Sequence, residues 1–185
     1  MKSIKRMSLG ELAAFVCTRL KKRGIEAVLS GGACVSIYTD GGYQSLDLDF
    51  IERVPAGGKR IKETLLAIGF VEKDRYFVHP DTDFFIDLPA GPLAIGSEPA
   101  REVREMAFST GRLSLLSPTD CVKDRLAAYY HWSDRQSLEQ ALLVAESREI
   151  DVKEIRRWSG VENRLSEFNS ICKDLSKASR RRRRS

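Results

Sequence analysis

A chain of 185 residues, of which 42% are apolar and 31% charged, has the length of one domain and the composition of an ordinary globular protein. No apolar run approaches the roughly 20 residues that a membrane helix needs, and the N-terminal segment is interrupted before a signal-peptide core can form, so we expect a cytoplasmic protein without a membrane partner. The net charge of +5 comes largely from an uninterrupted arginine run at 180–184, which is typical of a solvated tail.

The N-terminal half carries the local signals of a mixed α and β region. Ser8 and Glu11 form a capping-box pattern, and apolar residues at helical spacing follow them up to Gly24. Further along, short apolar segments predict strands at 26–29, 45–51, 70–72, 76–78 and 83–88, and helical spacing predicts helices at 31–38 and 59–68. This half is therefore expected to be rich in strands.

The C-terminal half is expected to be helical after one strand at 113–116. Helix start signals occur at Ser117-Pro118, at a capping-box pattern that begins with Ser133, and at Asp151, and a last helix is expected at about 162–177. We therefore predict an α/β core over residues 1–112, a helical region over 113–178 and a basic tail without fixed structure over 179–185.

Two aspartates on the predicted strand 45–51 are the first candidate site residues. Because alternate side chains of a strand share a face, Asp47 and Asp49 should point the same way, while Leu46, Leu48 and Phe50 point into the core. Two carboxylates so close together repel each other unless a positive group lies between them. Mg²⁺ accepts such oxygen ligands and usually completes its shell with water and substrate phosphates, so the pattern favours a Mg²⁺ site.

A third acid and a glycine pair extend this site. Asp87 ends the predicted strand 83–88, and beside the other two acids it would form a three-carboxylate cluster able to hold two Mg²⁺ ions, one activating a hydroxyl and one clamping a triphosphate. At Ser30-Gly31-Gly32 a predicted strand meets a predicted helix N-terminus, where free backbone N–H groups favour phosphate. The sequence thus predicts a phosphate site next to a metal site.

The order of these motifs resembles the DNA polymerase β-type nucleotidyltransferase superfamily, in particular its minimal members, including those of bacterial abortive-infection and toxin–antitoxin systems. The resemblance covers roughly 28–88 by motif and, more weakly, the helices after Ser117. It implies an α+β fold, with a nucleotidyltransferase-like small mixed β-sheet, flanking helices and a C-terminal helical region. It also implies Mg²⁺-dependent transfer of a nucleoside monophosphate from a nucleoside triphosphate (NTP) to a hydroxyl group of a protein or RNA, and a cognate toxin or antitoxin as a possible partner.

The resemblance also implies the roles of individual residues. The nucleotide-binding residues would be Ser30, Gly31, Gly32, Ser36 and Lys123, and the catalytic and metal-binding residues would be Asp47, Asp49 and Asp87. Asp87 would in addition act as the base, and Lys123 would face the cleft. Tyr43 stands four residues before Asp47, where many relatives carry an arginine, whereas Ser45 keeps a small hydroxyl position.

Two other classes of function stay open at this point. The chain could be a nucleotide-sensing or toxin-neutralising partner that keeps the fold without turnover, or an RNA-associated protein that uses the arginines at 180–184 for phosphate contacts. Turnover of an NTP separates the enzyme from both alternatives.

Overall fold

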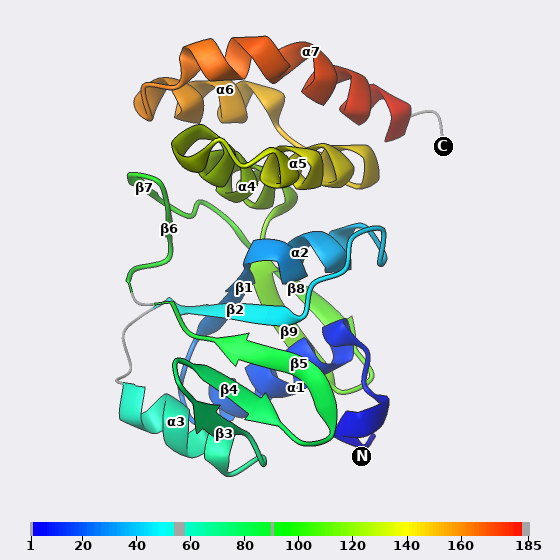
Figure 1. Ribbon diagram of the computed structural model, residues 1–185, viewed down its shortest axis with the longest axis vertical. Coiled ribbons are helices and arrows are strands. Elements are labelled where there is room, and N and C mark those ends of the chain that lie inside the picture. The colour runs from blue at the N-terminus through cyan, green and yellow to red at the C-terminus, as the bar shows by residue number, and fades with distance from the viewer. Residues whose placement is uncertain (1, 54–57, 90, 183–185) are drawn as a thin grey trace. The chain divides into compact units, whose positions relative to one another are not determined.

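The computed structural model describes residues 2–53, 58–89 and 91–182 (Figure 1). They divide into two compact units, which we call the sheet unit (Met1–Ala33, Ser45–Leu93 and Val103–Leu115) and the helical unit (Cys34–Gln44, Ala94–Glu102 and Leu116–Ser185). The sequence suggested one boundary at 112/113, whereas the structure groups 34–44 and 94–102 with the C-terminal helices. Local patterns do not show which distant segments pack together, so this grouping was not visible in the sequence.

The sheet unit is built on a seven-stranded mixed sheet with the order β3-β4-β5-β2-β1-β9-β8. The strands are β1 (Ala27–Ser30), β2 (Asp47–Glu52), β3 (Val71–Lys73), β4 (Tyr76–His79), β5 (Thr82–Asp87), β8 (Val103–Phe108) and β9 (Gly111–Leu116). β2 runs antiparallel to β1 and parallel to β5, and β1 runs parallel to β9. Every strand predicted from the sequence is present within a few residues.

One strand of this sheet was missed. β8 lies at the edge of the sheet, and it carries the charged residues Arg104 and Glu105 at exposed positions. Its sequence lacks the apolar run of a central strand, because an edge strand needs less burial and often carries charge.

Two helices complete the sheet unit. α1 (Leu9–Lys22) packs against β1, β8 and α3 (Gly58–Leu66), and α3 packs against β3. The capping box predicted at the start of α1 is confirmed, because the Ser8 side chain accepts a hydrogen bond from the Glu11 N–H and the Glu11 carboxylate accepts one from the Ser8 N–H. The predicted apolar face of α1 is buried, with Leu12, Val16 and Leu20 fully enclosed. A short 3-10 helix, η1 (Ile4–Arg6), precedes α1, and α2 (Gly31–Tyr38) follows β1.

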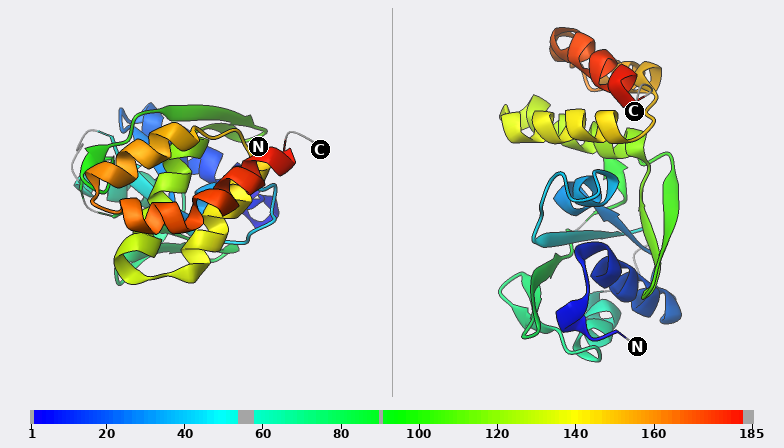
Figure 2. Two further views of the ribbon diagram at one scale, coloured as in Figure 1. Left: turned by 90° about the horizontal axis from the view of Figure 1, so that it is seen from above. Right: turned by 90° about the vertical axis from the view of Figure 1, so that its right-hand side faces the viewer.

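The helical unit contains four long helices in two layers, α4 and α5 in one and α6 and α7 in the other (Figures 1 and 2). They are α4 (Pro118–Trp132), α5 (Arg135–Ser147), α6 (Val152–Val161) and α7 (Leu165–Arg182). A short hairpin of β6 (Ala94–Ile95) and β7 (Glu98–Pro99) belongs to the same unit. The Trp158 indole N–H on α6 donates to the Ile95 carbonyl at 3.1 Å, which ties this hairpin to the helices.

The helix starts agree with the sequence at two positions and differ at one. Ser117 caps α4 and Asp151 caps α6, as predicted. The capping box that was expected to begin at Ser133 is wrong, because Ser133 has φ +53° and ends α4, and the carboxylate of Asp134 caps α5 by accepting from the Gln136 N–H.

The predicted disorder of the tail is wrong for 179–182, which belong to α7, while 183–185 lie outside the described residues. The helix continues because Leu175 and Ala178 keep its inner face buried, and because Arg181 forms an ion pair with Glu146 of α5 at 2.8 Å. Within the described residues, none of the helices has the length and apolar character that crossing a membrane requires.

Candidate active site

The pairing of β2 with β5 brings the candidate acids together. In this parallel pair Asp49 lies directly beside Asp87, and Asp47 lies beside Phe85. Since residues two apart share a face, all three carboxylates project from one face of the sheet. Leu48 and Ile86, which point the other way, are completely buried. The common face that the sequence predicted for the three acids is therefore confirmed. The expectation that Leu46 also points into the core is wrong: it is 56% exposed, because β2 begins only at Asp47 and Leu46 lies outside the strand.

The turn between β1 and α2 lies against Asp49. Gly31 has φ +65°, and a Cβ atom added there would lie 1.9 Å from Oδ2 of Asp49. Both facts require glycine, because a side chain would meet the carboxylate and the left-handed conformation is costly for other residues. Register maintains this contact, since Ser30 pairs with Asp49 across β1 and β2 and its hydroxyl donates to the Asp49 carbonyl oxygen at 3.3 Å. The expected phosphate turn therefore lies beside an expected metal ligand.

Two of the three carboxylates have identified side-chain partners. Asp47 accepts a hydrogen bond from the hydroxyl of Ser45, which is 7% exposed. Asp87 accepts at Oδ1 from the Leu88 N–H at 2.9 Å and at Oδ2 from the guanidinium of Arg75 at 3.1 Å. The acid face thus already contains one positive group, and that group contacts Asp87.

Arg75 is a site residue that the sequence reasoning missed. It lies in the turn between β3 and β4, its guanidinium carbon is 4.7 Å from the centre of the Tyr76 ring, and its side chain is 71% exposed. Hydrogen bonding with Tyr76 and the negative charge of Asp87 raise the pKa of Arg75 above its ordinary value. The sequence contained a signal for Arg75, since it predicted the three short strands in this order. If β4 pairs with β5 as an antiparallel neighbour, the turn before β4 lies near the end of β5, where Asp87 is.

The three acids are aligned, but their carboxylates do not converge. Over 2–53, 58–89 and 91–182, no group of three or more His, Cys, Asp or Glu side chains could hold a metal ion. Three carboxylates on adjacent strands about 4.8 Å apart are nevertheless a donor set that suits a hard divalent cation. The strand register places the three acids on one face, and their side chains would have to rotate toward one another to bind the same ion. The residues present therefore fit Mg²⁺ in chemistry and in placement along the strands.

Ser36 and Lys123 belong to the helical unit. Ser36 lies on α2, is half-buried, and accepts a hydrogen bond at its carbonyl from the Gly41 N–H at 3.0 Å. Lys123 is 1% exposed, and its ammonium lies 2.7 Å from Asp120 and 3.4 Å from Glu154. The expectation that Lys123 faces an open cleft is wrong, because two carboxylates enclose it. The sequence showed Asp120 one turn before Lys123, but Glu154 comes from α6 and could not be anticipated.

Solved structures share the fold of this chain. An antigenic nucleotidyltransferase-like protein from Paracoccidioides brasiliensis matches over 91% of this chain and 92% of its own, with a TM-score of 0.64 and 12% identity. The chain has a nucleotidyltransferase-like fold. The antibiotic-resistance factor ANT(2'')-Ia matches in its solution structure, over 91% of this chain and 95% of its own, with a TM-score of 0.50 and 14% identity.

A crystal structure of ANT(2")-Ia in complex with adenylyl-2"-tobramycin matches the same nucleotidyltransferase-like fold over 88% of this chain and 97% of its own, with a TM-score of 0.50 and 13% identity. No protein-family model matches the sequence, and no curated protein matches it either. At these identities the likeness shows the fold, and it confirms the predicted α+β class with a small mixed sheet, flanking helices and a C-terminal helical region.

Proposed function

We propose that this protein is a Mg²⁺-dependent nucleotidyltransferase that moves a nucleoside monophosphate from an NTP to a hydroxyl acceptor. The observation that carries the proposal is the parallel register of β2 and β5, which sets Asp49 beside Asp87 on the face that also bears Asp47. The Gly31 turn lies against Asp49, and solved nucleotidyltransferase-like proteins share the fold. Transfer from a triphosphate needs carboxylates to bind metal ions and, next to them, backbone N–H groups to bind phosphate, and both kinds of group are present here.

In this proposal each element of the site has one task. The backbone N–H groups at Gly31 and Gly32 would hold the triphosphate at the start of α2. Asp47, Asp49 and Asp87 would hold Mg²⁺, and two ions would suit three carboxylates. Mg²⁺, when bound, would supply positive charge to the triphosphate and to the leaving pyrophosphate. Asp87, at the end of its strand, would accept the proton of the acceptor hydroxyl.

The acceptor is proposed to be a hydroxyl group of a protein or of RNA. A small-molecule hydroxyl is within the range of the fold, since one matching structure is a complex with adenylyl-2"-tobramycin. A cognate toxin or antitoxin partner is part of the proposal because the motif order resembles the minimal nucleotidyltransferases of such systems.

A non-catalytic nucleotide-binding or toxin-neutralising partner is the second candidate function. Two observations favour it. The guanidinium of Arg75 lies 3.1 Å from Asp87, so a cation of the protein itself occupies the carboxylate that the enzyme would use as base. Tyr43 stands where the resemblance leads one to expect an arginine. Such a protein would bind an NTP and show no turnover.

Parallel Asp49→Asn and Asp87→Asn variants test the enzyme. Each exchange preserves shape and removes a negative charge from a crowded face, so both variants should fold. Transfer of labelled nucleoside monophosphate to protein or RNA should fall by about 10²-fold or more, because single preorganised groups of this kind typically contribute that much. The rates are compared at matched concentrations of folded protein with each of the four NTPs.

Asp83→Asn is the matched control, since Asp83 lies on the same strand and the same face but is exposed at its other end. It should transfer at the wild-type rate. Binding of an NTP by the wild type without transfer under any condition would favour the second candidate. Wild-type rates in both site variants would reject the assignment of these acids.

A further inference from the structure

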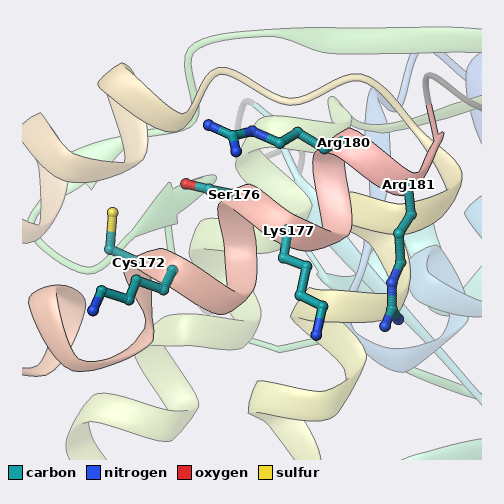
Figure 3. A pocket seen from close by; sticks show the side chains of 6 residues that line it. Cys172, Ser176, Lys177, Arg180 and Arg181 are labelled. Atoms are coloured by element: carbon teal, nitrogen blue, oxygen red, sulfur yellow. The ribbon is translucent and has the colours of Figure 1, made fainter.

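The outer surface of α7 contains a basic hollow that the proposed active site does not use. Its volume is about 560 Å³, and it is lined by Cys172, Lys173, Ser176, Lys177, Arg180 and Arg181 (Figure 3). Four of these six side chains are cationic, and none is a carboxylate. A hollow with this lining is suited to an anion.

Helical spacing arranges the cations in a regular pattern. Residues four apart lie above one another on a helix, so Lys173, Lys177 and Arg181 form one row and Arg180 continues the adjacent row. In Figure 3 the side chains of Lys177 and Arg181 extend one way and that of Arg180 the other, so that they flank the same hollow on one face of the helix. At about 1.5 Å per residue, the seven steps from Lys173 to Arg180 span about 10 Å, so Lys173, Lys177 and Arg180 lie at intervals of about 5 Å along the helix.

Three of these cations are not neutralised within the protein. Arg181 donates to Glu146 at 2.8 Å, whereas Lys173, Lys177 and Arg180 make no ion pair with any described residue. All three are exposed. Their uncompensated charge would gain from phosphate contacts, and the planar guanidinium of Arg180 suits a phosphate group in particular.

The packing of α7 distinguishes nucleic acid from a membrane surface. A basic helix that binds membranes inserts an apolar face into the lipid. Four apolar residues of α7, Phe168, Ile171, Leu175 and Ala178, are at most 4% exposed because the helix packs against α5 and α6. Leu165, at the first position of α7, is 43% exposed, but it lies two turns before Lys173 and a single leucine does not form an apolar face. A phosphate backbone is therefore the better partner of the cations.

We infer that the α7 face formed by Lys173, Lys177 and Arg180 binds the phosphate backbone of a single-stranded nucleic acid, for which an RNA oligonucleotide is the probe. This inference does not depend on the proposed transfer activity, because it concerns binding alone and uses different residues. Arg183 and Arg184 add positive charge to the sequence, but they lie outside the described residues and are not part of this inference.

The test compares a Lys173→Gln, Lys177→Gln, Arg180→Gln triple variant of the full chain with the wild type. Binding of a fluorescently labelled oligouridylate is followed by anisotropy over a range of salt concentrations. Each phosphate contact contributes about 0.7 to the salt slope for a single strand, so three lost contacts should lower the slope by about 2 and weaken binding on the order of 50-fold near 0.15 M salt. Circular dichroism verifies that the variant is folded.

A charge-matched control carries Lys22→Gln, Lys59→Gln and Lys73→Gln, which are exposed positions of the sheet unit. It should bind RNA as the wild type does. The inference is overturned if the control loses as much affinity as the α7 variant, since net charge alone would then explain binding. It is also overturned if exchanging only the arginines at 182–184 accounts for the whole loss, or if the wild type binds phosphatidylserine vesicles and no RNA.

Discussion

Replacing Gly31 by alanine would place a methyl group 1.9 Å from Oδ2 and 3.0 Å from Cγ of Asp49. The left-handed φ of +65° costs an alanine about 1–2 kcal/mol. The carboxylate of Asp49 must also rotate away, and leaving its preferred rotamer costs about 0.5–1.5 kcal/mol. We therefore expect Gly31→Ala to lower the free energy of unfolding by about 2–3 kcal/mol. Because Asp49 is displaced, nucleotidyl transfer should fall by about 10²-fold.

Gly41→Ala is the matched control for this change. Gly41 has φ +86°, and nothing lies within 4 Å of an added Cβ atom, so this variant isolates the backbone cost. Its free energy of unfolding should fall by only about 1–2 kcal/mol, and transfer should stay at the wild-type rate. Urea unfolding gives the stabilities by linear extrapolation, and transfer of labelled nucleoside monophosphate gives the rates.

A double variant tests whether the contact with Asp49 is the cause. When Asp49 is also replaced by alanine, the cost of Gly31→Ala should decrease to that of Gly41→Ala, because no carboxylate remains to be displaced. The reasoning is refuted if Gly31→Ala transfers at the wild-type rate. A second result would also refute it, namely that Gly31→Ala lowers the free energy of unfolding equally in the wild type and in the Asp49→Ala background, and by more than Gly41→Ala does.

Three further predictions follow from the same structure. Thermal stabilisation by an NTP should require Mg²⁺ and vanish with a chelator, because phosphates and the acid face repel each other without a cation; equal stabilisation in both conditions would contradict this. Arg75→Gln removes the positive charge that contacts Asp87, so Mg²⁺ should bind several-fold more tightly by calorimetry, whereas Arg53→Gln, at another exposed ion pair, should leave the affinity unchanged. Arg157 and then Lys123 lower the pKa of Glu154 from 4.5 to about 2, so its stabilising effect is complete above pH 4.5 and is lost as the pH falls toward 2. Glu154→Gln should lower stability at pH 7 by about 1–3 kcal/mol, because Lys123 keeps its contact with Asp120, and should flatten this part of the acid-unfolding curve; an unchanged curve would contradict the pairing.

The sequence by itself determined the features that depend on neighbours along the chain. The period of two in a strand put Asp47 and Asp49 on one face, and the glycines at 31 and 32 marked the turn from strand to helix. Caps at Ser8, Ser117 and Asp151 set helix starts for the same reason, since a cap is a contact between residues two or three apart. A capping pattern failed only at Ser133, where the end of one helix competes with the start of the next.

Only the tertiary structure decided which distant residues meet. The partner of Asp49 depends on the order of the strands, and the order β5-β2-β1 is what places Asp87 beside it. The contact of Arg75 with Asp87 depends on a hairpin folding onto that strand, and the burial of Lys123 depends on Glu154 from another helix. These contacts join residues 12 and 31 positions apart, where local periodicity carries no information, so the sequence showed Asp120 one turn before Lys123 but neither Glu154 beside it nor Arg75 beside Asp87.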